Sequence, residues 1–257
     1  MQLKEINGAL FVSGSGTDAD SVMAAFIDGR LPPQLKKLWL ISTKPGAGGL
    51  DKADKRGIEH LVIAREGKRD DEAMQQEFEQ AVTTWVLQHN IHVIFLLGCI
   101  HKIPMIPGVV IYNIHPALPF EHGGNGMYGL DVHLHVLGSI VDLIQRGRKR
   151  LGDAFVTVPT VHLAIREYDS GEALLQEEVP VPSEIIEQAM SGANMLRKGI
   201  RTAVKSKGAD GMNLIINGQT ALNEAASALQ QVVLPVEHEI LPKAFTLACE
   251  RLLVNAN

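Results

Sequence analysis

Residues 9–27, ALFVSGSGTDADSVMAAFI, decide the fold class of this chain. The apolar run 9–12 leads into a turn with two glycines, and the apolar periodicity of residues 21–27 then indicates a helix. A strand, a glycine turn and a helix form the first half of a βαβ unit. LWLIS at 38–42 supplies the second strand.

The same alternation continues through the first half of the chain. Strands are predicted at 60–64, 92–97 and 108–113, and helices at 49–57 and 72–90. Such alternation favours an α/β fold with a Rossmann-like, mostly parallel sheet that has helices on both faces. Because ligands of open α/β sheets bind outside the carboxyl ends of the strands, the end of the last of these strands is a candidate site.

The second half of the chain is less regular. Strands at 160–168 and 172–181, joined by the turn 169–171, predict a C-terminal β-hairpin. Long helices are predicted before and after it, and Pro235 and Pro242 are expected to interrupt the last helix. The predicted helices span 132–150, 184–200 and 221–253, and residues 202–213 are predicted to form a basic loop that contains glycine.

The composition is that of an ordinary globular protein. Of the 257 residues, 46% are hydrophobic and 21% are charged, which is enough to bury a core. The formal net charge of −5 gives no basic surface for a nucleic acid, so no nucleic acid partner is expected. Two cysteines, Cys99 and Cys249, are too few for a disulfide framework. The first residues do not resemble a signal peptide and the apolar run 93–100 is too short to span a bilayer, so we expect a soluble cytoplasmic protein without a membrane partner.

The turn Gly14, Ser15, Gly16, Thr17, Asp18 is a candidate phosphate site. At a strand-to-helix junction, its backbone N–H groups and the helix dipole would attract an anion. However, the third glycine of the dinucleotide motif and the lysine of the P-loop are both missing. Two alternatives stay open. Either the stretch is only a tight turn in which Thr17 caps the helix, or it binds no anion because the carboxylates of Asp18 and Asp20 compete with an anion for the positive end of the helix dipole.

Asn113 and His115 are candidate catalytic residues at the end of the 108–113 strand. Two positions apart in an extended segment, their side chains point to the same side. An amide donor and an imidazole together suit the stabilisation of an oxyanion during acyl transfer. Asp169 in the hairpin turn is the best candidate for a group that orients or charges the imidazole. The alternative is that all three merely satisfy local backbone groups, as such residues do in turns.

Several histidines invite a metal site as well. No HExxH or comparable ligand pair is present, and residues two apart on a helix do not face each other, so no metal is predicted. The histidines considered were His115, His122, His133, His135 and His162.

Taken in order, six segments of the chain resemble the folate-dependent formyltransferases, most closely those that act on glycinamide ribonucleotide. No single segment is decisive, but six in the family's order are much more specific than any one of them. The segments are VSGSGTD, LISTKPGAGGLDKADKRGIEHLVI, FLLGCIHKI, IYNIHPALP, TVHLAIREYDSGEALLQEEVPV and VEHEILP.

The resemblance implies a role for each matched position. Asn113 and His115 fall on the family's catalytic Asn and His, and Asp169 on its catalytic Asp, seven residues after the His of TVH. The turn 14–18 would take the ribonucleotide phosphate, and 10-formyltetrahydrofolate would be the co-substrate. The positions that would line the folate pocket are Ile100, His101, Lys102, Ile103, Ile165 and Arg166.

The chain also departs from this family. Asp18 stands where the family usually has Asn, and the glycine-rich stretch FEHGGNGMYG (120–129) follows a shortened HPALP. Two extra segments, 138–156 and 183–220, are expected as insertions in one formyltransferase-like domain that spans residues 1–257. These departures concern the amine acceptor rather than the catalytic residues.

The resemblance implies a formyltransferase of purine biosynthesis and one-carbon metabolism that acts on a small phosphorylated amine, such as glycinamide ribonucleotide. A hydrolase that releases formate from the same folate, with water as the acceptor, is one alternative. A non-catalytic binder of a sugar phosphate or folate is another, although such a binder has no need of Asp169. A homodimer is also considered.

Overall fold

The structure of the protein is a computed structural model that describes residues 4–67, 71–167, 169–206 and 209–255. Its contacts divide the chain into two compact units. The sheet unit consists of Met1–His115, Thr160–Gln176 and Glu237–Asn257, and the helical unit consists of Pro116–Pro159 and Glu177–Val236. That the two units fold together as one domain stays a prediction.

The sheet unit contains a seven-stranded sheet with the strand order β3-β2-β1-β4-β5-β7-β8. The strands from β3 to β5 are parallel, and β7 and β8 form an antiparallel hairpin at the β5 edge. The predicted mostly parallel sheet with an added hairpin is therefore confirmed. The strands are β1 (Ile6–Val12), β2 (Leu35–Ser42), β3 (His60–Val62), β4 (Val93–Leu96), β5 (Val110–His115), β7 (Thr160–Leu163) and β8 (Ala173–Gln176).

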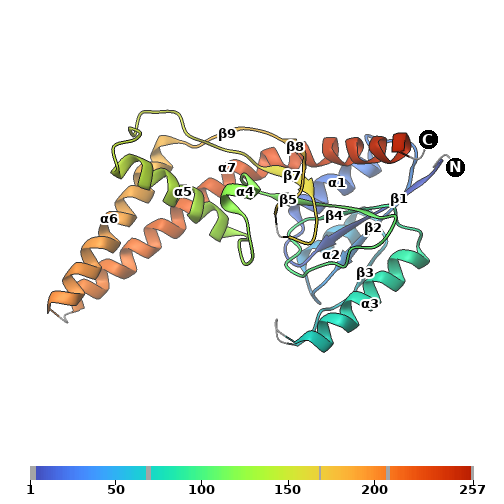
Figure 1. The fold of residues 1–257 in the computed structure, drawn as a ribbon, viewed down its shortest axis with the longest axis horizontal. Coiled ribbons are helices and arrows are strands. Elements are labelled where there is room, and N and C mark those ends of the chain that lie inside the picture. Colours follow the sequence, from blue (N-terminus) through green and yellow to red (C-terminus); the bar gives the residue numbers. More distant parts are fainter. Residues whose placement is uncertain (1–3, 68–70, 168, 207–208, 256–257) are drawn as a thin grey trace. The chain divides into compact units, whose positions relative to one another are not determined.

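Helices cover both faces of this sheet. Helix α3 (Glu72–Gln88) buries an apolar stripe that includes Val82 against one face, where Phe11 lies. On the other face, Phe245 of the C-terminal helix packs on Phe95 with a ring separation of 4.7 Å. Figure 1 shows these two helices on opposite sides of the strands. Helices α1 (Thr17–Ile27) and α2 (Gly48–Arg56) complete the βαβ connections.

The helical unit is built around a hairpin of two long helices, α6 (Ser183–Ser206) and the first part of α7 (Ala209–Asn255). Helix α5 (Leu130–Gln145) packs on this hairpin and buries Val136, Leu137 and Ile140 in a common core. The short helix α4 (Pro119–His122) precedes α5. Two short strands, β6 (Val156–Thr157) and β9 (Val179–Pro180), pair antiparallel. No helix among the described residues is both long and apolar enough to cross a membrane.

Two sequence predictions about these helices were wrong. Residues 202–206 and 209–213 are helical and not a loop, because α6 continues to Ser206 and α7 begins at Ala209, while residues 207–208 of this prediction lie outside the described residues. Gly211 serves helix packing: a Cβ on it would lie only 2.6 Å from the backbone nitrogen of Ala203 on the facing helix. The predicted interruption near Pro235 and Pro242 is also absent, because α7 runs as one helix to Asn255. Burial along α7 compensates for the two lost backbone hydrogen bonds.

Candidate functional site

The candidate site begins at the carboxyl end of β5. Asn113 and His115 lie two positions apart on this strand, and in the antiparallel pairing with β7 they stand opposite His162 and Thr160. Asp169 lies in the turn between β7 and β8, with a left-handed backbone φ of 54°. Aspartate tolerates this conformation better than most residues do. The hairpin turn therefore brings Asp169 back over the end of β5.

The three predicted catalytic residues come together in the structure. The Asn113 amide nitrogen donates to Oδ1 of Asp169 at 3.4 Å, and Nδ1 of His115 lies 4.0 Å from Oδ2 of the same carboxylate. The side chain of His115 is 4% exposed and that of Asp169 is 10% exposed. In such a dry environment the attraction between a carboxylate and an imidazolium is much stronger than in water. The carboxylate thus presents one oxygen to the amide and the other to the imidazole.

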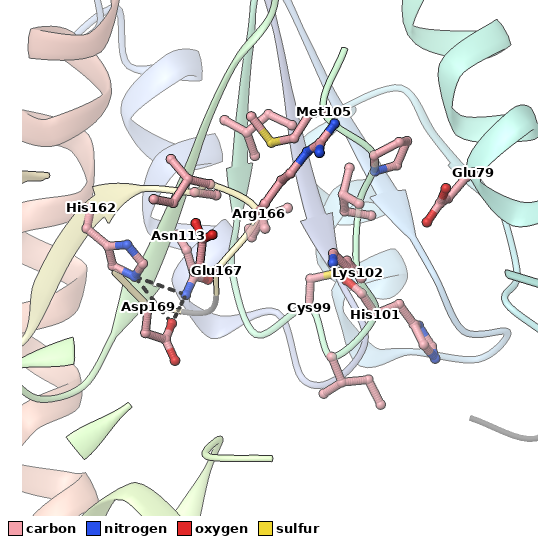
Figure 2. A pocket seen from close by; sticks show the side chains of 17 residues that line it. Glu79, Cys99, His101, Lys102, Met105, Asn113, His162, Arg166, Glu167 and Asp169 are labelled. Atoms are coloured by element: carbon pink, nitrogen blue, oxygen red, sulfur yellow. Dashed lines mark hydrogen bonds and ion pairs between the residues drawn. The ribbon is translucent and has the colours of Figure 1, made fainter. Parts of the chain in front are cut away.

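His162 is a fourth member of this group, and it was considered from the sequence only as a metal ligand. Its Nε2 lies 3.3 Å from the Asn113 amide nitrogen and 3.5 Å from Oδ1 of Asp169, as Figure 2 shows. Its Nδ1 lies 3.1 Å from the Leu163 carbonyl oxygen, which accepts a hydrogen bond if Nδ1 is protonated. In that tautomer, Nε2 accepts from Asn113 when the ring is neutral and donates to Asp169 when it is charged. The position of His162 opposite Asn113 follows from strand pairing, which the sequence alone does not reveal.

A cavity of about 530 Å³ opens in front of these residues. Asn113, His162 and Asp169 line one end of it, whereas His115 is not among the described residues that line it. The side chain of Arg166 extends toward Met105 (Figure 2). All six residues predicted for a folate pocket line this cavity, namely Ile100, His101, Lys102, Ile103, Ile165 and Arg166. The volume is within the range of sites for small organic ligands.

The wall formed by residues 100–103 is fixed by a short chain of hydrogen bonds. The backbone nitrogen of Ile100 donates to the Ser13 hydroxyl at 3.0 Å, and that hydroxyl is bonded to the Thr43 hydroxyl at 2.6 Å. Nδ1 of His101 contacts the same Thr43 hydroxyl at 2.8 Å. These bonds tie the wall to the carboxyl ends of β1 and β2. Burial raises the pKa of the neighbouring Cys99 thiol, which makes it a poor nucleophile at neutral pH.

The candidate phosphate turn, Gly14, Ser15, Gly16, Thr17, Asp18, joins β1 to α1 as predicted. The residue that caps α1 is Gly16 in the left-handed conformation, not Thr17, so the prediction of a Thr17 cap was wrong. A Cβ on Gly16 would lie 2.5 Å from the Cα of Gly49, so only glycine fits this close approach. The tight turn leaves the first backbone N–H groups of α1 at the sheet edge.

Acidic side chains stand beside this turn. Oδ1 of Asp18 and Nε2 of His238 are buried atoms 3.4 Å apart, and neither has a hydrogen-bond partner among the described residues. Glu237 is 6% exposed, and its burial, reinforced by the charge of Asp18, raises its pKa well above the usual value. Asp20 accepts hydrogen bonds from Nε and Nη2 of Arg56, at 2.6 and 2.9 Å, so its charge is compensated. Glu237 and His238 were not predicted as site residues, although they belong to the segment VEHEILP.

The remaining histidines do not form a metal site in the described part of the chain. His122 and His135 contact each other through their Nδ1 atoms at 3.0 Å in the helical unit, and His133 is buried in α5. No group of three or more His, Cys, Asp or Glu side chains that could hold a metal ion occurs among the described residues.

Comparisons with known proteins agree on one family. The formyl transferase family matches residues 6–195. Phosphoribosylglycinamide formyltransferase, chloroplastic, of Arabidopsis thaliana is 27% identical over 225 residues, which are 82% of this chain and 70% of that protein. The protein of the same name from Vigna unguiculata is 31% identical over 67% of this chain, and the chain spans about half of its length, 51%.

A solved structure has the same fold. Glycinamide ribonucleotide transformylase 1 from Symbiobacterium toebii aligns with a TM-score of 0.60 at 21% identity, covering 96% of this chain and 89% of that one. At this identity the likeness establishes the fold alone.

Proposed function

The chain belongs to the formyl transferase family, and we propose that it transfers the formyl group of 10-formyltetrahydrofolate to the amine of glycinamide ribonucleotide. One observation carries this proposal: an amide, a carboxylate and the imidazole of His162 line one end of a cavity of about 530 Å³, and the imidazole of His115 lies 4.0 Å from the same carboxylate. An acyl transfer needs a donor for the developing oxyanion and a group that accepts the amine proton. Asn113 and Asp169 supply these two functions.

The proposed mechanism assigns a role to each residue. As the amine nitrogen bonds to the formyl carbon, the carbonyl electrons move to oxygen, where the Asn113 amide and protonated His115 donate hydrogen bonds. Asp169 favours the charged form of His115 and accepts the amine proton, directly or through water. When the carbonyl re-forms, the bond to the folate nitrogen breaks and that nitrogen takes up the proton that Asp169 accepted, directly or through water. Protons are conserved over the cycle.

His115 has to reach the reacting oxygen from its buried position. It does not line the cavity, and its Nδ1 lies 4.0 Å from Asp169. Hydrogen bonds of catalytic groups are often long before substrate binds. We propose that substrate binding tightens this contact, and that Asn113, which lines the cavity, is the first donor to meet the formyl oxygen.

The cavity fits a folate in its chemistry. Ile100, Ile103 and Ile165 provide apolar walls for a flat ring system. Lys102 and Arg166 line the same cavity, where their charges would favour a carboxylate-bearing tail. The positions of Lys102 and Arg166 on the cavity wall, together with that of His101, support the assignment of this wall to the folate.

We place the acceptor's phosphate at the turn 14–18. The glycines that allow its close packing and the dipole of α1 favour an anion there. Asp18 opposes this attraction unless His238, 3.4 Å away, is protonated and compensates its charge. The turn 14–18 therefore suits its proposed role as a phosphate site less well than Asn113, His115 and Asp169 suit their proposed catalytic roles.

The relatives named above are transferases, which does not favour the hydrolase or the non-catalytic binder. The test is to incubate the protein with 10-formyltetrahydrofolate, with and without glycinamide ribonucleotide, and to follow the folate product. Product that requires the amine is expected. Product formed equally fast without the amine would identify a hydrolase, and folate binding without any product would identify a binder.

We also propose a cytoplasmic location and a homodimer. Some relatives carry a chloroplastic name, so imaging of the tagged protein in its native cell is the direct test of location. Light scattering of the purified protein at micromolar concentration tests the homodimer, and a monomer mass would contradict it.

A further inference from the structure

The distal half of the α6–α7 hairpin exposes apolar side chains that the proposed formyl transfer does not use. We propose that these residues form a docking surface for an acidic amphipathic helix of a partner protein. The surface, called the apolar patch below, consists of Ile200, Val204, Met212 and Ile216, which are 50%, 79%, 55% and 54% exposed. Clustered exposure of this kind marks interaction sites more often than scattered single residues do.

The four residues lie on one face of the hairpin. Close contacts between the helices occur at Gly199 and Ala203 on α6, and at Gly211 and Ile215 on α7. Each residue of the apolar patch directly follows one of these contact positions. In two antiparallel helices, residues at the same offset from the contact positions fall on the same side of the pair. The apolar patch is therefore continuous across both helices.

This face is the one on which α5 already packs. Arg197 on α6 donates a hydrogen bond to the side chain of Gln145, the last residue of α5. Val204 lies seven residues, or two turns, beyond Arg197 and so on the same side of α6. The hairpin continues past the end of α5 in Figure 1. The hairpin therefore accepts a helix on this face near its base and leaves the same face uncovered near its tip.

Charge decides what kind of helix fits. Residues 197–204 contain three basic side chains, Arg197, Lys198 and Arg201, and no acidic one. The turn 146–150 after α5 contains four basic residues, of which Arg146 is paired with Asp142, in a chain whose net charge is −5. Arg201, which follows Ile200 on α6, is exposed, and no carboxylate among the described residues pairs with it. An apolar stripe flanked by Asp or Glu would complement both the apolar patch and these cations.

Other occupants fit less well. A second copy of this chain would bring the same cations to the interface, where like charges repel. A membrane surface is usually bound through Trp, Phe and Leu, but residues 183–236 contain no aromatic side chain. Moreover, α5 packs on the same face of the hairpin. Because the axes of packed helices are about 8–10 Å apart, α5 would prevent a flat bilayer from contacting the part of the hairpin that it covers.

The size of the surface sets the length of the partner helix. From Arg197 to the end of α6 at Ser206 the helix rises by about 15 Å, which corresponds to roughly three turns. A helix of about 10 to 14 residues therefore covers the apolar patch.

The test uses a fluorescein-labelled synthetic helix of 14 residues, with Leu along one face and Glu on both flanks, and the full chain. Anisotropy is expected to show binding that weakens with salt. Ile216→Asp and Arg201→Glu should each lower the affinity at least tenfold. The matched control, Leu87→Asp, changes an equally exposed apolar residue on α3 of the sheet unit and should bind like the wild type.

Several results would overturn the proposal. They are the absence of peptide binding, equal binding by Ile216→Asp, and equal binding of a peptide with Lys in place of Glu. Cosedimentation with phosphatidylserine-containing vesicles that Ile216→Asp abolishes would assign the patch to a membrane. A dimer that Ile216→Asp dissociates would assign it to a second copy. Circular dichroism verifies that each variant folds, and Val204→Ser at the most exposed position serves if Ile216→Asp does not.

Discussion

The sheet unit packs its layers through large side chains, whereas the α6–α7 hairpin of the helical unit packs backbone against backbone. Phe11, Phe95 and Phe245 are fully buried around the sheet. In the hairpin, Gly192 and Gly211 face the backbone of the other helix. A Cβ on Gly192 would lie 2.9 Å from the Gly218 carbonyl oxygen, and one on Gly211 would lie 2.6 Å from the Ala203 nitrogen. Close approach of two helices turns longer side chains outward, which explains why a packed hairpin exposes four apolar residues.

The two units also differ in where polar groups are placed. In the sheet unit, buried polar side chains converge at the ends of β1 and β5, where they are costly unless they have a function. In the distal half of the hairpin, charged residues lie at the surface. The difference suggests that the sheet unit performs the family's chemistry and that the hairpin serves recognition, and four experiments test this division.

The largest effect is expected from Asp169→Asn. The loss of the carboxylate removes the proton acceptor and the partner of His115, so turnover should fall by about 10²–10⁴-fold, while folate binding is largely kept. Steady-state rates and folate titration measure the two properties. The matched change in the hairpin, Asp210→Asn, should leave turnover unchanged. If Asp169→Asn were fully active, Asp169 would have no place in the mechanism.

The next effect compares two glycines of the helical unit. Gly211→Val inserts atoms where a Cβ already meets backbone at 2.6 Å, so it should lower the free energy of unfolding by about 1–3 kcal/mol. Gly138→Ala on α5 has nothing within 4 Å and should instead raise it by about 0.5–1 kcal/mol, because alanine favours a helix. Urea unfolding measures both changes. The same sign for both variants would contradict the backbone packing of the hairpin.

A pH-dependent effect is expected at Glu237 in the sheet unit. Its pKa is raised by burial, whereas in the unfolded chain it ionises near pH 4.3. Stability due to this group is therefore complete below that pH and is lost as pH rises toward the folded pKa. Glu237→Gln should remove this loss, so its melting temperature relative to wild type should be higher at pH 8 than at pH 4. A difference independent of pH would show that Glu237 ionises normally.

The smallest effect is expected at the ion pair of Asp20 and Arg56. The Arg56 guanidinium lowers the pKa of Asp20, so the pair stabilises the protein above about pH 4 and is lost as pH falls further. Because both side chains are 33% exposed, Asp20→Asn should cost at most about 1 kcal/mol at pH 7. Thermal unfolding at pH 7 and pH 3 measures it. If Asp20→Asn lowered the stability more at pH 3 than at pH 7, the ion pair would not be the source of the stabilisation.

Much of the sheet unit could be predicted from the sequence because its signals are local. The run 9–12, the turn at Gly16 and the helix that follows each have a characteristic period or residue type, and all three occur where they were predicted. Asn113 and His115 could be paired in the same way from the period of a strand. Asp169 was a candidate from its place in the hairpin turn, and the spacing of the family then supported it, since nothing local distinguishes it from an ordinary turn residue.

The rest depends on contacts between segments that are distant in the sequence. His162 joins Asn113 and Asp169 only because β5 and β7 pair in one register, and Glu237 reaches Asp18 only because α7 packs beside the first βα turn. The sequence by itself determined the α/β class, because period and turn chemistry are local properties, and the order of its motifs indicated the candidate site residues and the cavity wall. Only the tertiary structure decided that residues 202–206 and 209–213 are helical, because Gly211 is accommodated in a helix there by the close approach of the facing helix.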